Sequence, residues 1–256
     1  MATNMTYLIT GANRGIGKQL VSDLLLRPST TVVGTVRDPN HDTAISLKSL
    51  PLADKSQLVV VPLKESRTDF AYNTLHGRLL RENINTLDVV IANAGASPSF
   101  DATLETDPEV VRECMDVNSI GPLRLFQACW ALLDKSDNGD LKRKKFVLIS
   151  SSTGSISVLD YETFPNAAYG MSKAAANWLA KKLSVEFKDR GLKVGIIHPG
   201  WVRTGMGQQL ANAVGVLEPP NTVEESSRQV LEQVDNLSFE TTHGKFVSIG
   251  GQVLPW

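Results

Sequence analysis

Short apolar runs rich in β-branched residues alternate with longer amphipathic segments along the whole chain. This alternation is typical of βαβ units, so it predicts an α/β fold with a doubly wound parallel sheet of seven strands, in one domain over residues 1–256. The expected strands are Thr6–Thr10, Thr31–Val36, Leu58–Val61, Leu87–Ala92, Lys145–Ser150, Val194–His198 and Lys245–Ser248. The expected helices are Gly15–Leu26, Thr43–Leu50, Asp69–Arg81, Pro108–Leu133, Ala167–Asp189 and Thr222–Asn236.

Three features do not follow the regular alternation. The polar stretch Asp134–Lys145 is expected to be a surface loop, and we interpret its basic cluster Lys142–Lys145 as the solvated entry to a strand. The stretch Thr204–Pro220 follows a strand, holds several apolar residues and lacks clear helical caps, so a substrate lid and an irregular loop are both open interpretations. Pro122 falls inside a predicted helix and indicates a local distortion there.

The chain has 256 residues, of which 42% are hydrophobic and 21% charged, as in an ordinary globular protein with a sizeable core. The formal net charge of -1 attracts neither phosphate backbones nor anionic lipids, so we expect no nucleic-acid or membrane partner. Cys114 and Cys129 are too few for a disulfide scaffold and lack metal-ligand spacing, so we expect reduced thiols and no metal site. Because no leader segment precedes the first strand and no apolar run is long enough to span a membrane, we expect a cytoplasmic protein.

A glycine-rich turn links the first predicted strand to an amphipathic helix. Glycines let the backbone turn sharply and approach a pyrophosphate closely, and the free N–H groups at a helix start favour an anion. Strand, turn and helix follow one another in the order that a dinucleotide site requires, so we interpret the turn as a phosphate cradle rather than as a turn without a ligand. The residues of this turn are Thr10, Gly11, Ala12, Asn13, Arg14, Gly15, Ile16 and Gly17.

The end of the second predicted strand bears on the choice of dinucleotide. Many dinucleotide-binding folds carry an acidic residue there that holds the ribose hydroxyls, but this strand ends at Val36 and continues with Arg37. Arg37 alone is well explained as a surface residue paired with Asp38. Together with Arg14 it offers two guanidinium groups to a 2′-phosphate, so the sequence predicts NADP(H) rather than NAD(H).

Tyr169 and Lys173 stand four residues apart in a predicted helix, which places the phenol and the ammonium on one face. A tyrosine with its ordinary pKa of about 10 is a poor proton-transfer group at neutral pH. A nearby cation, helped by an oxidised nicotinamide ring, stabilises the phenolate and lowers that pKa. Such pairs are frequent by chance on solvated helices, but Ser150–Ser152 at the carboxyl end of a predicted strand favour a catalytic role.

The spacing of Gly11, Gly15 and Gly17 has the form Thr-Gly-x-x-x-Gly-x-Gly, and with it the chain resembles the short-chain dehydrogenase/reductase family, whose fold is a Rossmann-like domain. Aligning the family form Ser-Ser-x-x-Gly on Gly154 implies Ser151 as the catalytic serine, and a shift by one residue stays open. The resemblance implies further that Asn118 supports a proton-relay water near the lysine, and that His198 is structural. The other residues implied to contact the cofactor are Asn93, Ala94, Gly95, Tyr169, Lys173, Pro199, Gly200, Val202 through its backbone and Thr204 through its hydroxyl.

Two features distinguish this chain within the family. After the third predicted strand it has Lys64, which cannot accept a hydrogen bond, where the family often has an aspartate that receives the adenine amino group. The ending Gly250–Trp256 resembles the subgroup of fungal norsolorinic acid ketoreductase-like proteins and insect sniffer-type carbonyl reductases.

The resemblance implies an NADPH-dependent ketoreductase of secondary metabolism that delivers a hydride to the carbonyl carbon of an apolar, aromatic or polyketide-like ketone, with alcohol oxidation as the reverse reaction. Tyr169 would donate the proton, Ser151 would hold the oxygen, and Lys173 would lower the tyrosine pKa and bind the nicotinamide ribose. Two other classes stay open: an NADP(H)-binding redox sensor, and a pathway enzyme that reduces an imine or guides a cyclisation. The complete catalytic set argues against both.

The stretch between Ser151 and Tyr169 is longer than in many family members, and its apolar residues are expected to line the substrate pocket. Trp201 is either a pocket wall or part of the core. The family resemblance also implies a homodimer or homotetramer formed through the long fourth and fifth helices. The expected pocket residues are Leu159, Tyr161, Phe164, Pro165, Trp201 and Met206.

Overall fold

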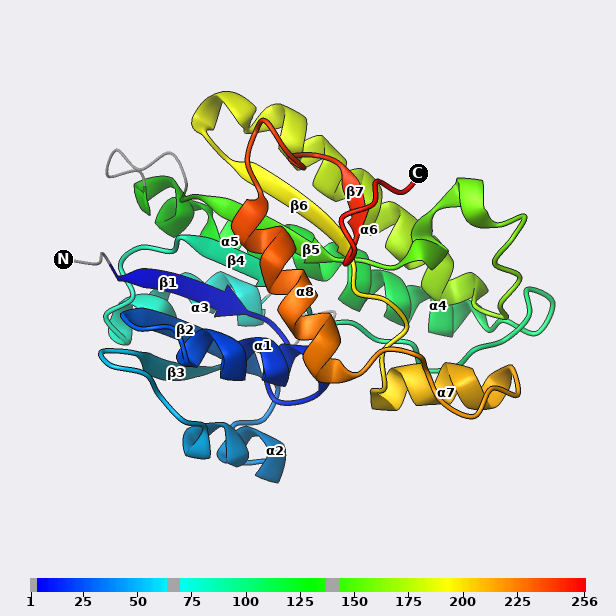
Figure 1. Ribbon diagram of the computed structural model, residues 1–256, viewed down its shortest axis with the longest axis horizontal. Coiled ribbons are helices and arrows are strands. Elements are labelled where there is room, and N and C mark those ends of the chain that lie inside the picture. Colours follow the sequence, from blue (N-terminus) through cyan, green and yellow to red (C-terminus); the bar gives the residue numbers. More distant parts are fainter. Residues whose placement is uncertain (1–3, 64–69, 137–142) are drawn as a thin grey trace.

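The computed structural model describes residues 4–63, 70–136 and 143–256. Within this part of the chain, seven parallel strands form one sheet in the order β3-β2-β1-β4-β5-β6-β7, which confirms the predicted α/β fold (Figure 1). The strands are β1 (Met5–Ile9), β2 (Thr30–Val36), β3 (Gln57–Pro62), β4 (Val89–Ala92), β5 (Lys145–Ile149), β6 (Lys193–His198) and β7 (Phe246–Ser248).

Helices cover both faces of this sheet and enclose a core on each side. Helices α1 (Gly15–Leu25) and α8 (Val223–Asn236) pack side by side on one face, while α3 (Phe70–Arg81), α5 (Gly121–Leu133) and α6 (Ala167–Glu186) cover the other (Figure 1). Every residue of β2 and of β5 is buried, because both faces of a doubly wound sheet are covered. The short helix α2 (Asp42–Ile45) lies between β2 and β3.

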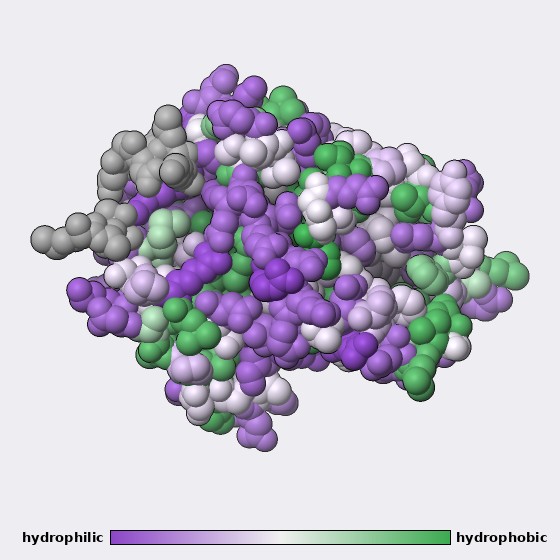
Figure 2. Space-filling view, viewed as in Figure 1, coloured by the Kyte–Doolittle hydropathy of each residue, from purple (hydrophilic) through white to green (hydrophobic). Residues whose placement is uncertain are grey.

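Helix α8 shows how the pattern of the sequence positions a covering helix. Val230, Leu231 and Val234 face the core, whereas the outer face carries charged and amide side chains. Thr222 begins the helix with a capping box, since its hydroxyl accepts from the Glu225 backbone while the Glu225 carboxylate accepts from the Thr222 backbone. Figure 2 shows the resulting hydrophilic surface over this side of the molecule.

The long helix predicted at residues 108–133 is continuous but locally distorted. It consists of α4 (Pro108–Met115), one π-helical turn (Asp116–Ile120) and α5, which begins one residue before Pro122. The distortion predicted from the proline is therefore confirmed, and it takes the form of a π turn, which occurs frequently at functional sites. Cys114 and Cys129 are buried free thiols on this helix, and burial raises the pKa of Cys129 to about 12.

The structure corrects two expectations. The stretch Thr204–Pro220 is not an irregular loop throughout, because it contains α7 (Gly205–Ala213). Thr204 caps this helix, since its hydroxyl accepts from the Gly207 backbone, and the sequence analysis missed this cap. The solvated strand entry predicted from the basic cluster is also wrong for its last two residues, whereas Lys142 lies outside the described residues. Lys144 and Lys145 are buried, and their ammonium groups donate to the carbonyls of Arg190 and Val234, respectively, which lie near the ends of other helical segments.

The carboxyl-terminal segment returns to the sheet. Trp256 stacks on Phe246 of β7 with ring centroids 5.8 Å apart, and its backbone oxygen accepts from the Ser157 hydroxyl. This contact ties the end of the chain to the segment between β5 and α6. Among the described helices, none combines the length and the apolar character that crossing a membrane requires.

Candidate active site

A cavity of about 1540 Å³ lies along the carboxyl ends of the strands. It includes the point between β1 and β4 where the strand order reverses, which is where open parallel sheets bind ligands. The structure brings nearly all sequence-predicted site residues to this one cavity. They are Gly11, Asn13, Arg14, Gly15, Ile16, Gly17, Arg37, Asn93, Ala94, Gly95, Ser151, Tyr169, Lys173, Pro199, Gly200, Trp201, Val202, Thr204 and Met206.

The glycine turn has the sharply turning backbone that its sequence predicts. Gly11 and Gly15 adopt left-handed φ angles of 65° and 52°, which side chains rarely allow. A Cβ on Gly17 would lie 2.2 Å from the Gly11 carbonyl oxygen, so no other residue fits there without displacing the backbone. The Asn93 amide donates to the Thr10 carbonyl at 2.9 Å and so holds the turn against the end of β4.

Helix α1 starts at this turn and directs its first backbone N–H groups to the cavity wall. Arg14 precedes the helix without making a side-chain cap, and the first turn of the helix contains no acidic residue. These donors are therefore available to an anion, in the positive field of a helix N-terminus. Gly15, Ile16 and Gly17 of this turn all line the cavity.

The glycine turn and the end of β2 each supply one cation, and no carboxylate, to the cavity wall. Arg14 and Arg37 are both exposed and line the cavity, and among the described residues neither forms an ion pair. Arg37 is a surface residue, as its alternative interpretation requires, but no ion pair joins it to Asp38 in the described structure, where Asp38 accepts from the Asn40 backbone at 2.9 Å. Val36 stands where many dinucleotide-binding folds have the acid that holds the ribose, and its apolar side chain is buried. The departure noted at Lys64 lies outside the described residues.

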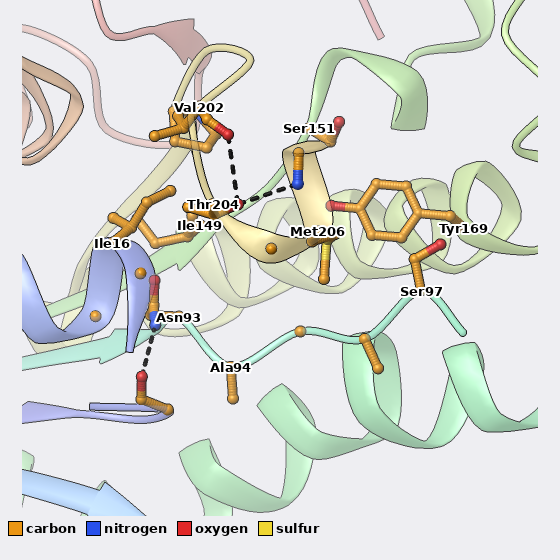
Figure 3. Close-up of a pocket in the computed structure, with 18 of the residues that line it drawn as sticks. Ile16, Asn93, Ala94, Ser97, Ile149, Ser151, Tyr169, Val202, Thr204 and Met206 are labelled. Atoms are coloured by element: carbon orange, nitrogen blue, oxygen red, sulfur yellow. Dashed lines mark hydrogen bonds between the residues drawn. The ribbon is translucent and has the colours of Figure 1, made fainter. Parts of the chain in front are cut away.

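Tyr169 stands in the first turn of α6, and its ring reaches into the cavity (Figure 3). Ser151 lines the same cavity, and its hydroxyl opposes the rise of the Tyr169 pKa that burial causes. The neighbouring serines point elsewhere, since the Ser150 hydroxyl bonds to Asn177 and the Ser152 hydroxyl donates to Glu162 at 3.0 Å. The geometry therefore favours Ser151 over its neighbours as the partner of the tyrosine.

Lys173 lies one helical turn further along α6, almost fully buried. Its ammonium donates to the Ile149 carbonyl at 2.9 Å and lies 5.6 Å from the centre of the Tyr169 ring. Burial lowers the pKa of Lys173 to about 8. Burial also raises the pKa of Tyr169 above its ordinary value, against the opposing hydrogen bond from Ser151. Among the protein's own groups, burial therefore outweighs the lowering of the Tyr169 pKa that the sequence predicted.

Asn118 lies in the π turn, fully buried, and does not line the cavity. Its amide oxygen accepts from the Ala96 backbone and its amide nitrogen donates to the Ala96 carbonyl, each at 2.8 Å. The same nitrogen donates to Ser172 at 2.9 Å, and the Ser172 hydroxyl donates to the Tyr169 carbonyl. Asn118 therefore ties the segment after β4 to the catalytic turn of α6, and a solvent-facing amide is excluded.

Aromatic side chains form the wall beyond the tyrosine. Phe100 meets the Tyr169 ring edge to face with centroids 6.4 Å apart, and Phe164 lies 5.8 Å from Trp201. Trp201 is a cavity wall, held by a 2.9 Å hydrogen bond from its indole nitrogen to the Gly207 carbonyl. These rings provide a largely apolar surface for a substrate.

Three of the expected pocket residues are wrong. Leu159 and Tyr161 do not line the cavity, and their side chains are 52% and 86% exposed. A 3₁₀ turn at Ile156–Val158 carries this part of the chain to the surface before it returns to the cavity. Pro165 is also outside the lining, whereas Phe164 is part of it.

Sequence reasoning missed several residues that line the cavity, because no motif includes them. Phe100 and Ser97 follow β4, and Glu162 and Asn166 precede α6. The polar residues Glu162 and Asn166 on either side of Phe164 were the only feature of the sequence that could have indicated these lining positions. His198, interpreted as structural, accepts from the Ser152 backbone at 3.1 Å, and burial lowers its pKa to about 4.

Comparisons with known proteins agree with this geometry. The family model described as short chain dehydrogenase matches residues 5–215. A short chain dehydrogenase of Penicillium aethiopicum is 40% identical over 98% of this chain and 99% of its own length. Norsolorinic acid ketoreductase of Aspergillus parasiticus is 36% identical over 98% of this chain and 90% of its own.

Solved structures share the whole fold. The NADPH-bound carbonyl reductase from chicken fatty liver has a TM-score of 0.87 at 31% identity, and the carbonyl reductase Sniffer of D. melanogaster has a TM-score of 0.84 at 27% identity. Both similarities cover 100% of this chain and 100% of the other. The chain therefore belongs to the short-chain dehydrogenase/reductase family of oxidoreductases.

Proposed function

We propose that this protein is an NADPH-dependent ketoreductase that reduces an apolar aromatic ketone. The observation that carries the proposal is the convergence of Tyr169, Ser151 and Lys173 in one cavity with the glycine turn of α1. A phosphate cradle and a proton-transfer group in the same cavity suit hydride chemistry at a carbonyl.

The residues present fit NADP(H). A Cβ would fill the cradle at Gly17, and the uncapped start of α1 offers backbone donors to a pyrophosphate. Arg14 and Arg37 would hold a 2′-phosphate, since guanidinium groups bind phosphate through charge-assisted hydrogen bonds. The further contacts proposed for the cofactor are made by Asn13, Ile16, Asn93, Ala94, Gly95, Tyr169, Lys173, Pro199, Gly200, Val202 and Thr204.

When bound, NADP(H) supplies the hydride for the carbonyl carbon and, in its oxidised form, a positive charge beside the tyrosine. Tyr169 donates the proton from its hydroxyl to the carbonyl oxygen, and Ser151 holds that oxygen with its own hydroxyl. The Lys173 ammonium stabilises the phenolate that remains. Asn118 fixes the catalytic turn and, as in the family resemblance, supports a water that returns a proton to the lysine.

The substrate class follows from the wall of the cavity. Phe100, Phe164, Trp201 and Met206 present apolar and aromatic surface next to Tyr169, which suits a planar, poorly charged ketone. The ketoreductase name of the relative from Aspergillus parasiticus supports the same reaction type in secondary metabolism.

Turnover tests the proposal directly. Purified protein is mixed with NADPH and a panel of aromatic ketones, diketones and quinones, and the fall in NADPH absorbance is followed beside the Tyr169→Phe variant. We expect ketone-dependent oxidation that falls about 100-fold or more in the variant, while NADPH binding persists. Tight NADPH binding without turnover of any ketone would overturn the proposal in favour of a redox sensor or of an enzyme dedicated to an imine or a cyclisation.

We also propose that two copies of the chain associate through α6. Met171, Trp178 and Val185 are spaced seven residues apart, so they lie on one face of this helix, and they are 57%, 68% and 65% exposed. Light scattering on the wild type should give twice the mass of one chain, and Trp178→Lys should give the mass of one. A monomeric wild type would contradict the dimer.

The cytoplasmic location expected from the sequence stays a prediction.

A further inference from the structure

The serine that we assign to the substrate oxygen has a neighbour without an assigned role. Ser151 is followed by a 3₁₀ turn, Ser152–Gly154, and Thr153 of this turn lines the same cavity. The family form Ser-Ser-x-x-Gly, aligned on Gly154, leaves position 153 unspecified. The motif therefore gives no reason for a threonine there, and the reason has to come from its contacts.

Thr153 makes two hydrogen bonds to the hydroxyl oxygen of Ser151. The Thr153 hydroxyl donates to it at 2.9 Å, and the Thr153 backbone N–H donates to it at 3.4 Å and so caps the 3₁₀ turn. A serine hydroxyl has two acceptor lone pairs and one donor hydrogen. Because Thr153 occupies both lone pairs, the hydrogen is the part of the Ser151 hydroxyl that is left to bond elsewhere.

A hydrogen directed away from Thr153 suits the role of Ser151 in the reaction. A ketone oxygen accepts hydrogen bonds but cannot donate them, so Ser151 holds it only as a donor. Burial raises the pKa of Tyr169, and the Ser151 hydroxyl opposes that rise, which is the effect of a donor on a phenolate oxygen. Hydrogen bonds in a chain polarise one another, so donation from Thr153 also strengthens donation by Ser151.

Contacts on both sides of Thr153 fix its place. Before it, the Ser152 backbone N–H donates to the Nδ1 atom of His198 at 3.1 Å. After it, Gly154 packs so closely on α6 that a Cβ there would lie 2.7 Å from the backbone carbonyl carbon of Lys173. The turn is therefore anchored to β6 and to α6, and the Thr153 hydroxyl is presented from a defined position.

We propose that Thr153 is a positioning residue that fixes the direction of the Ser151 hydroxyl hydrogen, so that Ser151 meets the ketone oxygen as a donor. Thr153 acts through Ser151 and not on the substrate. Negative charge develops on the ketone oxygen during hydride transfer, and a donor already in place stabilises it without reorientation. This inference rests on the proposed ketoreductase function, because it concerns the serine that holds the ketone oxygen.

Two substitutions at position 153 separate the hydroxyl from the shape of the side chain. With the aryl ketone that the wild type reduces fastest, Thr153→Val should lower kcat about 10-fold, because it removes the hydroxyl but keeps the branched shape. Thr153→Ser keeps the hydroxyl and should restore kcat to within about threefold of the wild type. The NADPH Kd should be unchanged in both. Thr163→Val, the same substitution at an exposed position outside the cavity lining, is the matched control.

A double-mutant cycle shows whether Thr153 acts through Ser151. Ser151→Ala removes the group that Thr153 directs, so adding Thr153→Val to it should lower kcat by less than about twofold. A general loosening of the turn, or a direct contact between Thr153 and the ketone, would instead give the full loss in both backgrounds. Full additivity, or a Thr153→Ser variant as impaired as Thr153→Val, would overturn the proposal.

Neutron diffraction separates this inference from the proposed function, because it needs no turnover. Crystals of the wild-type protein with NADP⁺, exchanged into D₂O, locate the hydroxyl deuterium atoms of Ser151 and Thr153. We expect the Thr153 deuterium on the line to the Ser151 oxygen and the Ser151 deuterium directed away from Thr153. A Ser151 deuterium directed at the Thr153 oxygen would show that the inference is wrong, whereas failure of every ketone to react would refute the ketoreductase function alone.

Discussion

Arg14 in the glycine turn and Arg37 after β2 allow the cofactor preference to be predicted with a magnitude. Arg14 and Arg37 line the cavity, and among the described residues neither is occupied by an ion pair. A hydrogen bond to a charged phosphate contributes about 1.5–3 kcal/mol, and exposure to water and salt favours the lower end of this range. At about 1.4 kcal/mol for each factor of ten, Arg37→Ala should weaken NADPH binding about 10-fold, and the double variant with Arg14→Ala about 100-fold.

The selectivity of the loss is what tests the reasoning. NADH lacks the 2′-phosphate, so its Kd should change less than threefold or so in the same variants. Fluorescence titration with both cofactors, repeated at low and high salt, measures the two Kd values directly. The ratio of the NADH Kd to the NADPH Kd should shrink as salt rises. Arg228→Ala removes an exposed arginine that does not line the cavity and serves as the control. Equal losses for NADH and NADPH would refute a phosphate-specific role.

Three further changes probe other parts of the structure. Gly17→Ala should abolish measurable NADPH binding in a titration, because its Cβ would lie 2.2 Å from the Gly11 carbonyl oxygen; retained affinity would show that the turn has room to relax. Since burial lowers the pKa of Lys173 to about 8, its ammonium is lost above that pH, and kcat/KM for ketone reduction should fall as the pH rises through this value; a flat profile would contradict the assignment. Thr222→Ala removes the cap on the Glu225 backbone and should lower the free energy of unfolding in urea by about 1 kcal/mol, whereas an unchanged midpoint would show that the capping box is dispensable.

The sequence predicted the strands, the long helices and the glycine turn because these depend on local chemistry. Runs of β-branched residues predict buried strands, and the conformations of Gly11 and Gly15 are ones that few other residues adopt. Pro122 marked the distorted helix for the same reason, since a proline lacks the backbone donor of a regular turn.

Long-range contacts explain what the sequence did not predict. The charged residues Lys144 and Lys145 are buried because helical segments distant in the sequence bring carbonyl oxygens to them, and no local pattern shows this. Tyr161 is apolar enough for a pocket, yet a 3₁₀ turn carries it to the surface. Glu162 and Asn166 belong to no motif, and only the folded cavity shows that they line it together.

Transfer of an isotopic label tests the central claim most directly. Purified protein is incubated with an aryl ketone and NADPH that carries deuterium at both positions of the nicotinamide C4, and the alcohol product is examined by mass spectrometry and NMR. We predict deuterium on the carbinol carbon of the wild-type product, and a rate at least about 100-fold lower for Tyr169→Phe even with saturating NADPH. Absence of deuterium from the product, or a Tyr169→Phe variant as active as the wild type, would contradict the account.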